Sequence, residues 1–370
     1  MRCAVLPPVA VPYREPLFAA LAERGRLELL VIYQSGAQPG WDQRADWFPD
    51  RHAYDAEVLS AHQRERAGRT PVLVPRALGR ALARFDPDCV VSWEYGASTL
   101  RAFAWCRRRG RPLVVFSELT PAVAAELSPG RRRLQRLLAP RLDGFIAASS
   151  AARERLLGLG VEPERIEVSL QSADLDAVRA AVERRGPRRD GPLRLLSVGR
   201  LVPDKNHTLL LRAFADAGAD SGAELVVCGS GPLEEALRRQ ATEDGLRVEF
   251  PGYVSPEKLP ELYAGADAFV LVSTFEPFGA AVREAAAAGL PLICSRRAGA
   301  AGDLAVEGEN ALLVDPDSRG EVAAALRRLI GDGELRRRLA TGSLAVTERH
   351  PLVADVEAFE RAVLRAPEPN

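Results

Sequence analysis

The chain has 370 residues, of which 47% are hydrophobic and 27% are charged, and its 50 basic and 50 acidic residues cancel. This length allows two domains that each bury a core of their own. The balanced charge argues against the strong positive field that is typical of nucleic-acid-binding proteins.

Cysteine usage and hydropathy indicate the compartment. The five cysteines are scattered and form no Cys-x-x-Cys pair, so we expect small buried side chains in a reducing environment rather than disulfides or a zinc site. The sequence has no run of 18 apolar residues, and it begins with a short strand instead of the apolar segment of a signal peptide. We therefore expect a cytoplasmic protein without a transmembrane segment.

In the first half of the chain, short apolar segments alternate with helical ones. The predicted strands cover 3–6, 27–32, 89–92, 113–116 and 144–147, and predicted helices include 16–23, 72–84 and 97–108. This alternation is typical of a parallel sheet covered by helices. We interpret the less regular region 41–66 as a longer excursion from this alternation. One role for it would be to line a cleft. The basic helix 131–138 is either an ordinary amphipathic surface helix or a peripheral contact with an anionic membrane.

The alternation stops near residue 174 and starts again after a polar segment. Residues 183–192 hold two glycines and two prolines, which makes them the best linker candidate in the chain. The later predicted strands cover 193–198, 225–228, 248–250, 269–272, 292–294 and 311–314. The sequence therefore predicts two α/β domains, with a separate amphipathic helix at 354–364.

Basic residues follow the first strand of the second half. Gly199 allows the backbone to approach a ligand, and Arg200 and Lys205 can converge on one anion such as a phosphate. The alternative is a pair of solvated loop cations. Lys205 and Lys258 are the only lysines in a chain whose basic residues are otherwise arginine, which favours a specific role for Lys205.

A glycine-rich turn follows the next strand. Gly229 and Gly231 precede a predicted helix, where free backbone N–H groups can hold a phosphate. The turn is not a dinucleotide-binding fingerprint, because Glu234 stands where the third glycine is needed. Turns of this kind also serve geometry alone.

Two carboxylates flank the turn after the strand 269–272. Glu276 lies in the turn, and Glu284 lies eight positions later, inside the helix that starts at Ala280. The amides of Phe278 and Gly279 would point toward the carboxyl edge of the sheet, where they and Glu276 can bind sugar hydroxyls. Glu284 can accept hydrogen bonds from a ribose diol, or it merely faces solvent. A further small-residue turn at 298–303 offers more backbone donors.

These motifs, in this order, resemble the retaining glycosyltransferases of the GT-B fold, family 4. The resemblance is best over residues 193–315. It rests on Gly199-Arg200 with Lys205-Asn206, Gly229-Ser230-Gly231-Pro232, Gly252-Tyr253-Val254 and Glu276-Pro277-Phe278-Gly279 with Glu284. The first half is similar more weakly, through Pro12-Tyr13-Arg14 and Ala147-Ala148-Ser149-Ser150.

The resemblance implies an α/β fold of two Rossmann-like domains that face each other across a cleft. It implies domains at 1–186 for the acceptor and 187–350 for a nucleotide-sugar donor, with 351–370 crossing back to the first domain. The expected reaction moves a sugar from a UDP-sugar, or a GDP-sugar, to the hydroxyl of a small-molecule, glycan or lipid-linked acceptor. No metal and no other cofactor is implied.

The resemblance also assigns roles to residues. Arg200 and Lys205 neutralise the leaving diphosphate, Glu284 holds the ribose, and Tyr253 and Val254 lie near the base. Glu276 holds the donor sugar. The remaining donor-binding residues are Gly199, Gly229, Gly231, Phe278, Gly279 and Ala280.

The sequence departs from the family pattern in several turns. A histidine often stands near the reacting sugar in the family, whereas this chain has Ser117-Glu118 at the matching strand end, so Glu118 is a further candidate catalytic residue. The first loop reads Pro7-Pro8-Val9-Ala10 instead of Gly-Gly, and Asp303 replaces a common glutamate. Three Asp-x-Asp sequences, at 86–88, 174–176 and 315–317, match a metal motif but are more typical of turns and caps.

Two other classes remain open at this point. One is a two-domain oxidoreductase, against which the missing G-x-G-x-x-G argues. The other is a nucleotide-sugar-binding protein or partner subunit that has the same fold but no catalytic activity.

Overall fold

The computed structural model describes residues 1–36, 51–59, 61–66, 69–75, 77–186, 191–218 and 222–366, and of residues 61–75 only the backbone. The chain forms two compact units, Met1–Ser172 with Pro351–Asn370 and Ala173–His350. The boundary after Ser172 lies earlier than the predicted boundary after residue 186. Helix α7 (Leu175–Arg185) accounts for the difference, because it packs on helices α10 and α11 of the second unit. Part of the predicted linker, 187–190, lies outside the described residues.

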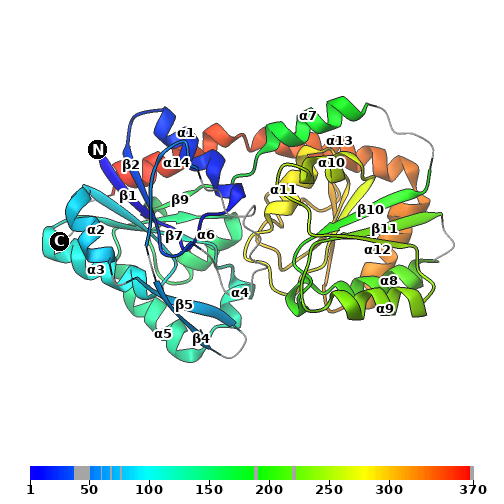
Figure 1. Ribbon diagram of the computed structural model, residues 1–370, viewed down its shortest axis with the longest axis horizontal. Coiled ribbons are helices and arrows are strands. Elements are labelled where there is room, and N and C mark those ends of the chain that lie inside the picture. The colour runs from blue at the N-terminus through cyan, green and yellow to red at the C-terminus, as the bar shows by residue number, and fades with distance from the viewer. Residues whose placement is uncertain are drawn as a thin grey trace. The chain divides into compact units, whose positions relative to one another are not determined.

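The first unit is built on a parallel sheet with the strand order β3-β2-β1-β6-β7-β8-β9 (Figure 1). Its strands are β1 (Arg2–Leu6), β2 (Glu28–Tyr33), β3 (Asp55–Val58), β6 (Cys89–Trp93), β7 (Leu113–Ser117), β8 (Gly144–Ala147) and β9 (Ile166–Val168). The central strands are buried on both faces, which explains why they appear in the sequence as continuous apolar runs. Strands β4 (Ala61–Arg66) and β5 (Arg69–Pro75) pair with each other as an antiparallel hairpin.

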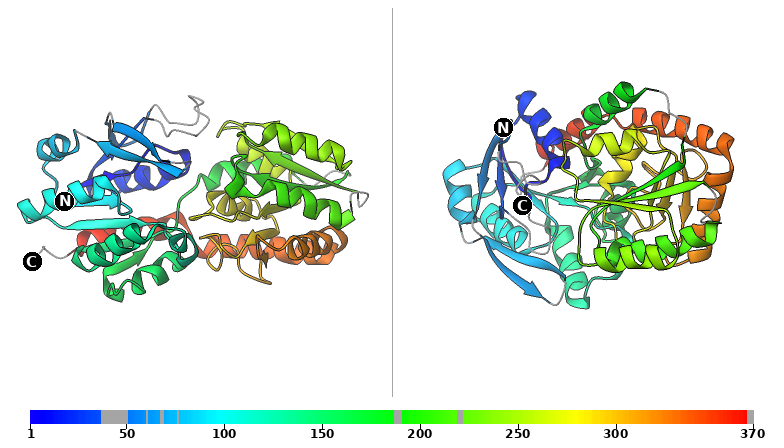
Figure 2. Two further views of the ribbon diagram at one scale, coloured as in Figure 1. Left: turned by 90° about the horizontal axis from the view of Figure 1, so that it is seen from below. Right: turned by 45° about the vertical axis from the view of Figure 1, so that its right-hand side comes forward.

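Helices cover both faces of this sheet. They are α1 (Glu15–Glu23), α2 (Leu78–Phe85), α3 (Ala97–Arg109), α4 (Pro121–Ala125), α5 (Pro129–Leu138), α6 (Ser150–Leu157) and α14 (Leu352–Leu364), with short 3-10 helices η1 (Pro12–Arg14), η3 (Ala139–Arg141) and η4 (Pro163–Arg165). Helix α14 packs on α1, β8 and β9, and the backbone N–H of Leu170 donates a 2.8 Å hydrogen bond to Oδ1 of Asp355. Figures 1 and 2 both show α14, in red, beside α1, in blue. The end of the chain is thus part of the first unit.

The predicted helix 72–84 is wrong over its first part. Residues 72–75 belong to strand β5, and the helix begins only at Leu78. Val72 and Val74 are β-branched residues that favour a strand, and Pro75 cannot continue a helix interior. Of the predicted excursion 41–66, residues 41–50 lie outside the described residues, and the rest contains β3 and β4.

The second unit has a parallel sheet with the strand order β12-β11-β10-β13-β14-β15. Its strands are β10 (Leu193–Val198), β11 (Ala223–Cys228), β12 (Val248–Gly252), β13 (Ala268–Leu271), β14 (Leu292–Ser295) and β15 (Ala311–Val314). Its helices are α7, η5 (Pro203–Lys205), α8 (His207–Gly218), α9 (Glu234–Glu243), α10 (Leu259–Ala264), α11 (Ala280–Ala287), α12 (Arg319–Gly331) and α13 (Gly333–Arg349). Helix α8 packs on α9 and α12 on one side of the sheet, and α7 packs on α10 and α11 on the other (Figure 1).

Each unit has the strand order of a doubly wound Rossmann-like sheet. In each sheet, the strands that follow the first one lie in order on one side of it, and the later strands lie in order on its other side. The predicted fold class is confirmed in this respect. Among the helices of the described residues, none is both long enough and apolar enough to span a membrane.

Candidate active site

The order of strands in the second unit reverses between β10 and β13. In a parallel sheet, ligands bind in the crevice at the carboxyl ends of the strands that flank such a switch point. Lys205 ends η5, which follows β10, and Glu276 lies in the turn after β13. The two predicted site residues therefore come from the two sides of the switch point.

The structure brings Lys205 and Glu276 together as an ion pair between Nζ and Oε2. Both side chains are largely buried, with exposed fractions of 19% for Lys205 and 9% for Glu276. The hydroxyl of Ser273 donates a 3.4 Å hydrogen bond to the same carboxylate oxygen. The cation predicted for the diphosphate and the carboxylate predicted for the sugar thus form one cluster.

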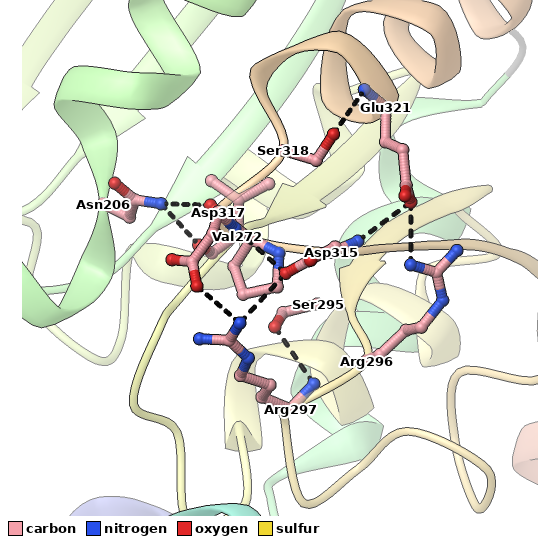
Figure 3. Close-up of polar contacts among 10 residues, drawn as sticks. Asn206, Val272, Ser295, Arg296, Arg297, Asp315, Asp317, Ser318 and Glu321 are labelled. Carbon is pink, nitrogen blue, oxygen red and sulfur yellow. Dashed lines mark hydrogen bonds and ion pairs between the residues drawn. The ribbon is translucent and has the colours of Figure 1, made fainter.

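Asn206 fastens the turn that carries Lys205. Its backbone is left-handed, with φ = 59°, a conformation that Asn tolerates better than most residues. Its Nδ2 donates hydrogen bonds of 3.3 Å to the carbonyl of Val272 and 2.8 Å to the carbonyl of Pro316 (Figure 3). The turn after β10 is therefore tied to the turns after β13 and β15. Arg200 lies earlier in the same turn and is exposed.

Glu284 does not simply face solvent. The hydroxyl of Tyr263, on α10, donates a 2.6 Å hydrogen bond to Oε2 of Glu284, on α11. Burial of the carboxyl group raises the pKa of Glu284 from 4.5 to about 7, the Tyr263 hydroxyl lowers it, and the negative charge of Asp174 adds to the rise. Tyr263 itself is fully buried. Its hydroxyl holds the carboxylate in one orientation in the second half of α11.

The glycines after β10 and β11 allow two backbone turns to pack in direct contact. A Cβ atom on Gly229 would lie 1.9 Å from the carbonyl oxygen of Gly199, and one on Gly231 would lie 2.5 Å from that of Leu201. The amide of Gly229 donates to the carbonyl of Gly252 at 2.9 Å. These contacts account for the glycines by geometry. A phosphate-binding role for this turn stays a prediction.

The turn after β13 is held in a similar way. Gly279 has φ = 98°, which only glycine adopts without strain, and it precedes Ala280, the first residue of α11. A Cβ on Gly299 would lie 1.9 Å from the carbonyl oxygen of Pro277. The amide of Ala300 donates a 2.8 Å hydrogen bond to the carbonyl of Phe278, which is buried. The loop 298–303 thus supports the turn predicted to bind the sugar.

Tyr253 and Val254 follow β12, and both are half-buried. The turn that they occupy is joined to the neighbouring one through the hydrogen bond from Gly229 to Gly252. Their place at the carboxyl edge of the sheet agrees with a position near the base, which stays a prediction.

The three Asp-x-Asp sequences serve turns and caps. Asp315 accepts a 3.1 Å hydrogen bond from the amide of Asp317, and Arg297 makes ion pairs with both carboxylates, as Figure 3 shows. Asp174 caps α7 through a 3.1 Å hydrogen bond from the amide of Ala177. Asp86 ends helix α2 in a left-handed backbone conformation. Asp88 accepts a hydrogen bond from the backbone N–H of Arg2.

Glu118 lies at the carboxyl end of β7 in the first unit, within a second polar cluster. Its Oε1 accepts hydrogen bonds of 2.8 Å from Arg14 and 2.9 Å from the indole N–H of Trp93. Arg14 is 6% exposed and lies over the Trp93 ring, 4.6 Å from its centre. Glu118 is therefore a well-held carboxylate in the unit expected to bind the acceptor. Its catalytic role stays a prediction.

Local sequence patterns did not predict three residues of these clusters, Tyr263, Trp93 and Glu94. Tyr263 falls in a short amphipathic helix, where a tyrosine looks like any core residue, although a buried hydroxyl needs a partner. Trp93 ends strand β6 and Glu94 follows it, beside the end of strand β7 that precedes Glu118. Both residues stand at a predicted strand end, as Glu118 does, and this position is the signal that could have found them.

Two family models cover most of the chain. The model of glycosyl transferases group 1 matches residues 179–343, and the model of glycosyltransferase family 4 matches residues 17–176. Among solved structures, Anabaena HepE in complex with UDP is similar with a TM-score of 0.77 and 20% identity, over 98% of this chain and 99% of that one. Sucrose-phosphate synthase from Thermosynechococcus elongatus has a TM-score of 0.74 and 18% identity, over 98% of each chain. These similarities define the fold as GT-B.

Curated relatives agree with the family models. Glycogen synthase of Mycobacterium tuberculosis is 30% identical over 221 residues, which are 59% of this chain and 53% of the relative. A lipopolysaccharide core biosynthesis glycosyltransferase of Rhizobium meliloti is 27% identical over 88% of this chain and 86% of the relative. The chain spans about half the length of the first curated relatives that it matches. With both family models, these findings show that the chain belongs to the group 1 glycosyltransferases.

Proposed function

We propose that the protein is a retaining glycosyltransferase that moves a sugar from a nucleotide-diphosphate sugar to an acceptor hydroxyl without a required metal ion. The observation that carries this proposal is the Lys205–Glu276 pair at the switch point of the second unit. Glu284 stands on the helix that follows Glu276, held by Tyr263. Together they offer a cation and two carboxylates at the edge where a nucleotide ligand is expected.

Each group matches one part of such a donor. Breaking the bond between sugar and phosphate leaves negative charge on the departing diphosphate, and cations placed there lower the barrier. Lys205 and Arg200 supply that charge in this proposal, in place of a metal ion. Glu276 accepts hydrogen bonds from the donor sugar, and Glu284 accepts them from the ribose diol. The diphosphate then competes with Glu276 for Lys205.

We favour UDP as the nucleotide, with GDP as the second choice. The similar Anabaena protein has been solved with UDP and with UDP-glucose, which supports UDP for this fold. The half-buried Tyr253 gives the base a ring to lie against. The acceptor is a small molecule, a glycan or a lipid-linked sugar, and the curated relatives differ widely in this respect.

A thermal-shift series with UDP, GDP and dTDP tests the donor class first, because a ligand that binds only the folded state raises the melting temperature. UDP is expected to give the largest shift, with and without EDTA. A panel of UDP-sugars then reports UDP release, and proton NMR of the product gives its anomeric configuration. Inversion, or a strict need for a divalent cation, would contradict the corresponding part of the proposal.

The same series separates catalysis from binding alone. A protein that binds UDP but releases none from any UDP-sugar, with or without acceptors, would be a nucleotide-sugar-binding protein or a partner subunit. If no nucleoside diphosphate raises the melting temperature, the result would contradict a donor site in the second unit.

A further inference from the structure

The first unit has a switch point of its own, between β1 and β6. Arg14 follows β1, Trp93 ends β6 and is followed by Glu94, and Glu118 directly follows β7. Ligands are expected at the carboxyl ends of these strands for the same reason as in the second unit. The cluster around Glu118 therefore occupies the place where this unit would bind its ligand.

Glu118 has one carboxylate oxygen available to a ligand. Both of its hydrogen bonds, from Arg14 and from Trp93, reach Oε1, and within the described part of the chain Oε2 has no partner. The Nε of Arg14 is buried and likewise has no hydrogen-bond partner among the described residues. A buried donor without a partner costs free energy, so its retention points to a ligand atom that it meets. The ion pair between Arg14 and Glu118 thus offers both an acceptor oxygen and a donor, as a sugar hydroxyl requires.

Glu94 holds the turn that carries Glu118. Its Oε1 accepts a 2.5 Å hydrogen bond from the backbone N–H of Glu118, and its Oε2 accepts a 3.2 Å bond from the hydroxyl of Ser117. Glu94 is thus bound to both residues at the end of β7. Its carboxylate points at the backbone behind Glu118 rather than at the side chain that would meet a ligand.

The backbone of Glu94 is itself strained and fixed on several sides. It is left-handed, with φ = 52°, a strained conformation that is rare outside glycine. Its amide donates a 2.9 Å hydrogen bond to the carbonyl of Phe116, and its carbonyl accepts a 2.7 Å bond from Thr99. Strain that the surroundings maintain in this way clusters at functional sites.

We infer that Glu94 is a positioning residue, which orients Glu118 so that Oε2 of Glu118 and Nε of Arg14 bind one sugar hydroxyl of the substrate. The inference rests on the proposed function, because it takes a sugar as the ligand. Glu94 acts through Glu118 and does not touch the ligand.

The charge state of Glu94 gives the inference a pH signature. Burial raises the pKa of Glu94 from 4.5 to about 8, the amide of Glu118 lowers it, and the negative charge of Glu118 raises it further. Tyr95 and Arg155 also interact electrostatically with Glu94. Ionisation of Glu94 above pH 8 places a second negative charge behind Glu118, so we expect turnover to fall there. Glu94→Gln copies the neutral form and should keep its turnover to higher pH.

The test compares Glu94→Ala, Glu94→Gln and Glu118→Ala, with the exposed Glu162→Ala as the matched control. The probe is UDP-glucose, or whichever UDP-sugar the panel shows to be consumed, and the readout is UDP release between pH 6 and 9. We expect at least a tenfold loss of turnover in Glu94→Ala, recovery in Glu94→Gln at pH 7, and no change in UDP affinity. In the Glu118→Ala background, Glu94→Ala should cost nothing more, because the two residues act as one unit.

Additive losses in the double variant would overturn the inference, as would a pH profile of Glu94→Gln that coincides with that of the wild type. Hydrogen exchange of the Glu118 amide provides a readout without turnover, and Glu94→Ala should raise its rate at least tenfold. Unchanged exchange would also overturn the inference. Failure of UDP to bind the wild type would instead contradict the proposed function, since that binding is assigned to the second unit.

Discussion

The hydroxyl of Tyr263 donates a 2.6 Å hydrogen bond to Oε2 of Glu284 and links helix α10 to helix α11. Tyr263 is fully buried, so the bond forms away from water. This bond to Oε2 favours one orientation of the half-buried carboxylate of Glu284. If Glu284 binds a ribose, Tyr263 determines how the carboxylate meets the diol.

Removal of this hydroxyl should weaken UDP binding. We expect Tyr263→Phe to raise the Kd for UDP by about fivefold, the value of one hydrogen bond of about 1 kcal/mol. Isothermal titration calorimetry measures it, and inorganic pyrophosphate, which has no ribose, should bind the variant and the wild type equally. Tyr95→Phe is the matched control, because the Tyr95 hydroxyl is buried without a hydrogen-bond partner among the described residues. Equal losses for UDP and pyrophosphate would contradict a role in ribose binding.

Substitution of Lys205 and substitution of Glu276 should change the affinity for UDP in opposite directions. Lys205→Ala removes the cation expected to meet the diphosphate, so UDP affinity and turnover should both fall, turnover by about 100-fold or more. Glu276→Gln frees Lys205 from its partner, so UDP should bind more tightly while turnover still falls. The chain offers a matched control in Lys258→Ala, since Lys258 is exposed and is the only other lysine. Weaker UDP binding in Glu276→Gln would show that the diphosphate and Glu276 do not compete for Lys205.

The sequence was sufficient for the positions of Lys205 and Glu276, since both follow apolar runs that only a buried parallel strand explains. Their direct contact was not predictable from local patterns. This contact depends on the strand order. Strand β10 lies beside β13 in the sheet, although 69 residues lie between Val198 and Ala268 in the sequence. Tyr263 was missed for a related reason, because its hydroxyl partner lies on another helix.

The error at residues 72–84 has a local cause instead. The apolar residues of β5 continue almost directly into those of α2, and a helical period can be fitted through both. Pro75 marks the break, because it cannot lie inside a helix without removing a hydrogen bond. The glycines after β11 show what a local pattern does not predict. Their pattern predicts a turn, but only the packed backbone shows that Gly229 contacts Gly199.

Protonation of Glu284 should make the stability of the protein depend on pH in a defined direction. Burial raises the pKa of Glu284 from 4.5 to about 7, so the folded state binds this proton more tightly than the unfolded state. The free energy of unfolding therefore falls as pH rises from about 4.5 to about 7. Glu284→Gln removes this contribution. Urea unfolding at pH 5, 6, 7 and 8 should show the variant gaining stability relative to the wild type as pH rises, whereas a constant difference would contradict the prediction.

The contact between Gly299 and Pro277 leaves no room for a side chain on Gly299. A Cβ on Gly299 would lie 1.9 Å from the carbonyl oxygen of Pro277, so Gly299→Ala must displace the turn that carries Glu276 and Phe278. We expect a loss of stability of about 2 kcal/mol or more, as for other overpacked sites, together with weaker UDP binding in the protein that folds. Gly320→Ala is the control, because its Cβ would meet nothing within 4 Å and it lies in α12, where alanine is favoured by about 0.5–1 kcal/mol. The two variants are thus expected to move the urea midpoint in opposite directions, and a Gly299→Ala midpoint equal to that of the wild type would show that the loop 298–303 yields without disturbing the site.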